Sequence, residues 1–140
     1  MIAIRSNRIR RRGASLVEFA LVAPLFFLVV LALIEFGRAF MVKELLTEAA
    51  RRGCRQGIIE GTSSDTIQSA AVNFLSNVGV KGASASVYVN GASAGSTNIS
   101  AMPVYTEITV VVTVSARNVA WTPSVFVTGS LSGQYTLRRE

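Results

Sequence analysis

A chain of 140 residues has room for one modest domain, and a long apolar segment near the N-terminus takes up part of that length. Its 14 Lys and Arg against 8 Asp and Glu give a formal charge of +6, but five of the arginines precede Gly13 and the rest is nearly neutral. A nucleic-acid-binding face would repeat basic residues and interleave them with aromatics, and nothing after Gly13 does so, which predicts no nucleic-acid partner.

Residues 1–13 form a basic leader, and residues 14–34 form an apolar run in which only Ser15 and Glu18 are polar. As a helix this run extends about 31 Å, which matches the hydrocarbon core of a bilayer. A removable secretory signal has a shorter apolar region that ends in small residues. We therefore expect a transmembrane helix in contact with membrane lipid. A buried helix of a soluble protein is disfavoured, because so small a chain could not cover it.

The charges on either side of this run predict its orientation. Charges of both signs follow Ile34, whereas only basic residues precede Gly13: Arg5, Arg8, Arg10, Arg11 and Arg12. The positive-inside rule then places the N-terminus in the cytoplasm. The expected topology is a single pass, with everything after Ile34 outside the cytoplasm.

Glu18 is a carboxylate near the start of the apolar run. A charge at the centre of a bilayer costs about 2.5 to 3.5 kcal/mol on insertion scales, and the cost falls towards the interface. The residue type alone leaves two interpretations open. Glu18 either reaches back to headgroups and water or is held for a partner cation that arrives during assembly.

The string RIRRRGASLVEFALVAP, residues 8–24, resembles the processing site of type IV prepilins. The resemblance implies that a prepilin peptidase cuts after Gly13, so that the mature chain begins at Ala14. Glu18 and Phe19 are then the fifth and sixth mature residues and serve in assembly. In that family the glutamate is thought to neutralise the N-terminus of a neighbouring subunit, which makes other pilins partners.

A longer stretch of sequence points to one particular family of such proteins. The run GASLVEFALVAPLFFLVVLALIEFGRAF, the following AARRGCRQG and the C-terminal YTLRRE are similar to the TadE-like family of the tight-adherence (Flp) pilus system. This implies a pseudopilin of the bacterial inner membrane that works with the pilus assembly machinery in adherence. Phe19 stands where the major pilins usually carry Tyr, and a soluble region follows the helix, so the resemblance favours a minor pilin.

Residues 35–60 keep a helical pattern, and we expect the anchor helix to continue outside the cytoplasm. Four small residues lie along one side of this extension: Ala49, Ala50, Gly53 and Gly57. Such a strip suits close contact with another helix. It equally suits packing against the protein's own sheet, and the sequence does not decide between the two.

Residues 61–140 predict a small α+β domain. Apolar residues from Ile67 to Val78 recur at helical spacing, with Ser64 or Asp65 as the cap. Alternating residues then predict strands at Val87 and Val89, Val104–Val114, Val125–Thr128 and Leu131–Leu137, with a flexible connector at Gly91–Asn98. The predicted fold class is therefore α+β. A long N-terminal transmembrane helix continues into an extracytoplasmic helix, and a short helix and a small antiparallel sheet follow.

Little in the composition suggests catalysis or metal binding. The chain has no histidine, which removes the commonest general base and metal ligand, and no paired acids mark a site. The single cysteine, Cys54, has flanking cations that could activate it, but packing as a small residue is the favoured interpretation. For Trp121 we favour core or interface packing over a ligand platform. We expect no enzyme, no cofactor or metal and no small-molecule substrate.

Two further hypotheses compete with the minor pilin. The chain could be an uncleaved single-span anchor that presents a binding or regulatory domain, which predicts an intact leader. It could instead be an anchored enzyme, which predicts activity in the region after Gly57.

Overall fold

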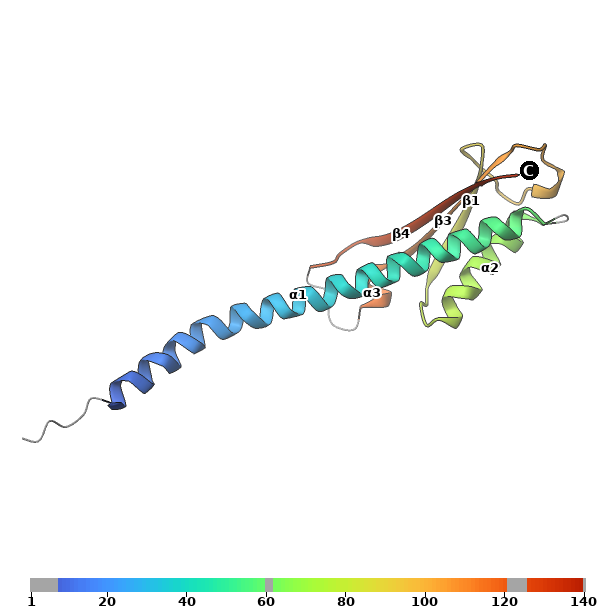
Figure 1. The fold of residues 1–140 in the computed structure, drawn as a ribbon. Helices are drawn as coiled ribbons and strands as arrows, with labels where there is room; N and C mark the ends of the chain where they lie inside the picture. The colour runs from blue at the N-terminus through green and yellow to red at the C-terminus, as the bar shows by residue number, and fades with distance from the viewer. Residues whose placement is uncertain (1–7, 60–61, 121–125, 140) are drawn as a thin grey trace, which may run out of the picture. The chain divides into compact units, whose positions relative to one another are not determined.

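The computed structural model describes residues 8–59, 62–120 and 126–139, with side chains from Gly13 onward except that of Ser100. The first seven residues of the predicted leader, together with Trp121 and Val125, lie outside the described residues. Along the chain the elements are α1 (Arg8–Gly57), α2 (Ser64–Asn77), β1 (Ala83–Val89), β2 (Ala92–Ser93), η1 (Ile99–Ala101), β3 (Glu107–Ser115), α3 (Ala116–Val119) and β4 (Ser130–Arg138). This order confirms the predicted α+β class (Figure 1).

Helix α1 is 50 residues long and passes through Pro24 without ending. The chain forms two compact units, Met1–Ile34 and Glu35–Glu140, and α1 contributes to both. In the second unit, Arg52 Nε lies 3.0 Å from Glu48 Oε1 one turn earlier, an ion pair in the favourable order along the helix. The helix therefore continues well past Ile34, as its polar but periodic sequence predicts.

Helix α2 begins one residue before its predicted start. Its N-cap is Ser63, whose hydroxyl accepts a hydrogen bond from the backbone N–H of Thr66. Both predicted caps, Ser64 and Asp65, lie inside the helix; Ser64 is buried, and its hydroxyl donates to the carbonyl of Gly95. Sequence could not separate two adjacent serines, since only their tertiary surroundings differ. The helix buries Ile67, Ala71 and Leu75 at helical spacing, as predicted.

The sheet is antiparallel, in the order β2-β1-β3-β4. Strand β3 is central and alternates buried and half-buried residues along its whole length, so one face packs inward and the other faces outward. Strands β1 and β2 are joined at Asn90 and Gly91, which both have positive φ, as a tight hairpin requires. The predicted flexible connector at Gly91–Asn98 is therefore wrong in part, because it contains β2.

Two strand predictions need correction. Strand β3 starts at Glu107 instead of Val104, because Tyr105 has a φ of 69°, which extended backbone cannot accommodate. The predicted strand Val125–Thr128 is wrong over its described part, since residues 126–128 belong to no strand. The Leu131–Leu137 prediction is confirmed within β4.

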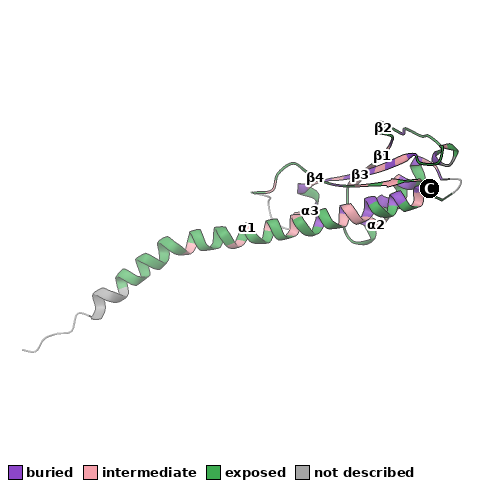
Figure 2. Cartoon of the chain, turned by 45° about the horizontal axis from the view of Figure 1, so that its top comes forward, coloured by how far each residue is buried: buried purple, intermediate pink, exposed green. Residues whose placement is uncertain are grey.

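The core lies between the sheet and the two long helices of the second unit. Helix α1 and helix α2 both bury apolar side chains against the inward residues of β3, and the buried set includes Val42, Leu46, Ile67, Leu75, Ile108, Val110 and Val112. Figure 2 shows this burial along the later turns of α1, while the earlier turns are exposed. The second unit therefore has its own hydrophobic core.

Strand β4 comes unusually close to α1 at Gly133. A Cβ atom on this glycine would lie 2.5 Å from the backbone nitrogen of Thr47 and 2.6 Å from the carbonyl carbon of Leu46. Only a residue without a side chain allows the strand to approach the helix backbone this closely.

Candidate anchor and assembly site

The N-terminal part of α1 presents apolar side chains all around its circumference. The large hydrophobic residues from Leu16 to Ile34 are exposed except Val30, which is half-buried. Among the described residues one helix, within Gly13–Gly57, is long and apolar enough to cross a membrane. A helix that is apolar on every side avoids water only inside a membrane or a large protein core. One long apolar helix near the N-terminus fits a single-pass membrane protein.

All four predicted site residues lie on this helix. Gly13, Ala14, Glu18 and Phe19 are exposed and helical, and a Cβ at Gly13 would meet nothing within 4 Å. Ala14 and Glu18 are four residues apart and so share one face of the helix. Local helical geometry alone brings these residues together.

Gly13 lies inside α1, since the helix begins at Arg8. Glycine costs a helix roughly 1 kcal/mol relative to alanine, so α1 opens more easily at this position than at its apolar neighbours. A peptidase that needs an extended chain would have to open the helix here.

The small-residue strip on the later part of α1 packs within the second unit. Ala49, Ala50, Gly53 and Gly57 are all buried. A Cβ on Gly53 would lie 3.4 Å from side-chain atoms of both Ile67 on α2 and Val110 on β3. The structure thus decides between the two interpretations of this strip, because α2 and the sheet already cover it.

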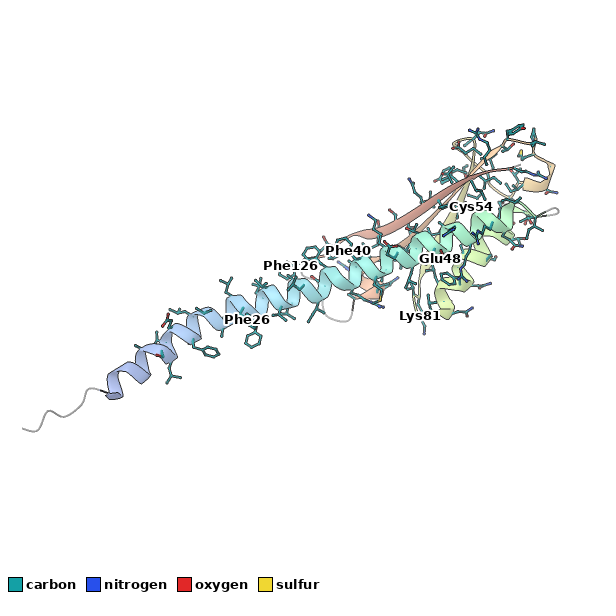
Figure 3. All side chains as sticks on the ribbon, viewed as in Figure 1. Phe26, Phe40, Glu48, Cys54, Lys81 and Phe126 are labelled. Atoms are coloured by element: carbon teal, nitrogen blue, oxygen red, sulfur yellow. The ribbon has the colours of Figure 1, made fainter. Side chains whose placement is uncertain are left out.

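Cys54 is fully buried between α1 and the sheet, and Figure 3 labels it on this part of the helix. Its Sγ lies 3.1 Å from the carbonyl oxygen of Tyr135 and 3.6 Å from that of Ile108. Burial raises the pKa of the thiol from 9.0 to about 11, against the smaller opposite effect of a backbone hydrogen bond at Val110. The neighbouring arginines therefore do not activate it, and the packing interpretation is the correct one.

We expect Cys54 to react slowly with thiol reagents in the folded protein. Only the thiolate is nucleophilic, and a pKa near 11 instead of 9.0 leaves roughly a hundredfold less thiolate at pH 8. Labelling by a maleimide should therefore be at least that much slower in the native chain than in urea, with the rate still rising between pH 9 and pH 10. Equal native and unfolded rates would contradict the buried position.

No group of three or more His, Cys, Asp or Glu gathers to hold a metal within the part of the chain that the structure describes. Two polar contacts that the sequence did not predict involve residues at the start of the second unit. The Glu35 carboxylate accepts the backbone N–H of Phe126 at 2.7 Å, and Arg38 Nε donates to the carbonyl of Val119 at 3.2 Å. The only signal in the sequence was two charged residues directly after an apolar run.

Comparison with known protein families gives a match over the apolar part of α1 and most of its extension. Residues 13–55 match the model of the TadE-like protein family. The resemblance to TadE-like proteins is thereby confirmed for the apolar part of α1 and most of its extension. No curated protein and no solved structure matches the chain. Proteins of the matched family are associated with the Tad pilus and are generally structural, and the match leaves α2 and the sheet of this chain uncovered.

Proposed function

We propose that the chain is a minor pilin of the Tad (Flp-type) pilus, processed by a prepilin peptidase after Gly13 and used in pilus assembly for adherence. The observation that carries the proposal is Glu18, an exposed carboxylate in an apolar helix, five residues after Gly13 within the TadE-like match. In this proposal residues 1–13 are a cytoplasmic leader, residues 14–34 span the inner membrane, and residues 35–60 and 61–140 lie outside the cytoplasm.

Cleavage would change the electrostatic surroundings of Glu18. In the uncut chain Glu18 lies in the interior of α1, well after its start at Arg8. Cutting after Gly13 would create an α-ammonium group at Ala14 and place Glu18 one turn from a new, positively charged helix N-terminus. An amino group paired with this carboxylate, in the same chain or a neighbouring pilin, would remove two isolated charges from the lipid.

The first experiment is the N-terminal sequence and intact mass of the protein isolated from the membranes of its native host. We expect a chain that begins at Ala14, and an uncut chain in a host that lacks its prepilin peptidase. A chain that retains Arg8 to Gly13 in the normal host would overturn processing and favour the uncleaved anchor.

A pair of variants separates the effect of the site from that of the helix. Gly13→Leu should block cleavage. Gly37→Leu should not, although Gly37 is also a helical glycine around which a Cβ meets nothing within 4 Å. Blocked cleavage in both variants would show that helix flexibility in general, and not the Gly13 position, controls processing.

A further inference from the structure

The first turns of α1 after the apolar run carry exposed apolar side chains that the folded unit does not cover. Phe36, Phe40 and Met41 are 46%, 68% and 55% exposed, and Phe126 is 40% exposed. We call these four residues the collar; Figure 3 labels Phe40 and Phe126 on this stretch. Glu35 and Arg38 within this stretch are half-buried, and the exposed charged side chains of Lys43 and Glu44 follow it.

Phe126 belongs to the collar because of one hydrogen bond. It is 91 residues from Glu35 in sequence, yet its backbone N–H donates to the Glu35 carboxylate at 2.7 Å. Three residues further along α1, Arg38 binds the carbonyl of Val119. These two contacts hold the backbone before β4 against the turn of α1 that directly follows the apolar run.

Along α1, the collar begins within the depth of a membrane interface and extends to just beyond the outer edge of that interface. At 1.5 Å per residue, Phe36 and Phe40 lie about 3 Å and 9 Å beyond Ile34 along α1. The polar layer on each side of the hydrocarbon core is roughly 5 to 8 Å thick. Amphipathic helices bury aromatic and other apolar side chains at this boundary.

We infer that the collar contacts lipid at the outer surface of the membrane that holds the anchor, so that the folded unit rests on the bilayer. The inference rests on the proposed membrane span. Lipid is the favoured occupant because the collar follows the apolar run on the same helix and ends where the exposed charges of Lys43 and Glu44 begin. The charges of Glu35 and Arg38 are compatible with a position at the membrane surface, because both side chains form hydrogen bonds with backbone groups of the same unit.

Spin labels can measure the depth of each position. In a Cys54→Ser background, Phe126→Cys and Phe40→Cys carry a nitroxide in the full chain, reconstituted in vesicles of phosphatidylcholine and phosphatidylglycerol. Ser132→Cys, on the exposed face of β4, is the control in the same unit, and Phe26→Cys reports on the span. The readout is the collision rate of each label with lipid-soluble oxygen relative to a water-soluble nickel chelate.

We expect the labels at residues 126 and 40 to favour oxygen several-fold over the label at residue 132. Adding Glu35→Ala should return the label at residue 126 towards water while leaving residue 40 in lipid. A water-exposed label at residue 126 with residue 26 in lipid would overturn the collar inference alone. A water-exposed label at residue 26 would overturn the membrane span itself.

One further outcome is decisive, and one control applies to every labelled variant. Labels at residue 126 that are shielded from both reagents and broaden one another would show a second copy on the collar, which contradicts lipid contact. An unchanged circular dichroism spectrum for each labelled variant shows that the unit is folded, so that water exposure cannot be attributed to unfolding.

Discussion

Replacing Gly133 with alanine is expected to lower the free energy of unfolding by about 3 kcal/mol, near the upper end of the usual cost of overpacking. The added Cβ would lie within 2.6 Å of backbone atoms of Thr47 and Leu46. Backbone atoms of a packed helix cannot rotate away as a side-chain terminus can. Relief would require β4 to move off α1, which would disturb its pairing with β3 from Ser130 to Arg138.

The change is best measured by urea unfolding of the full chain in detergent, followed by circular dichroism. Ser132→Ala, on the neighbouring exposed residue, should change stability by less than about 0.5 kcal/mol. Gly37→Ala should be neutral or stabilise by up to about 1 kcal/mol, because it removes a glycine from an open position on a helix. If Gly133→Ala were as stable as Ser132→Ala, the close approach of β4 to α1 would be wrong.

Replacing Glu18 with alanine is expected to reduce surface pili by at least about a hundredfold while leaving membrane insertion intact. Losing one partner of a buried ion pair costs about 3 to 5 kcal/mol, and each 1.4 kcal/mol is a factor of ten. Insertion itself should become easier, since an apolar segment without a charge enters a bilayer at lower cost. Pili are counted by electron microscopy, and insertion is measured by resistance to alkaline extraction.

Two other variants test whether the charge of Glu18 is what matters. Glu18→Gln keeps the size of the side chain and should fail almost as completely as alanine, because it cannot neutralise an amino group. Glu44→Ala removes an exposed glutamate from the same helix beyond the apolar run and should assemble normally. Normal pili from Glu18→Ala would remove the main support for the minor-pilin proposal.

Local patterns predicted much of this fold because each depends on a short stretch of chain. The apolar run 14–34, the spacing of Ile67, Ala71 and Leu75 in α2 and the alternation along β3 all describe which side of one element avoids water. The β1–β2 hairpin was missed, although Asn90 and Gly91 are a typical pair for such a turn. Its strand β2 has only two residues, too short for alternation to show.

The candidate processing and assembly residues were predictable for the same reason, since Gly13, Ala14, Glu18 and Phe19 lie within two turns of one helix. Their roles stay a proposal. The contact of Glu35 with Phe126 could not be read from sequence, because it joins residues that are 91 positions apart.

By itself, the sequence determined that the chain has an apolar helix long enough to span a membrane, a TadE-like segment and a small α+β region, because hydrophobic periodicity and local motifs need no distant contacts. Only the tertiary structure decided the environment of Cys54, the covering of the small-residue strip and the need for glycine at residue 133. Each of these depends on which elements meet across the core. A residue's exposure and pKa follow from those neighbours, and the residues beside it in the chain do not determine them.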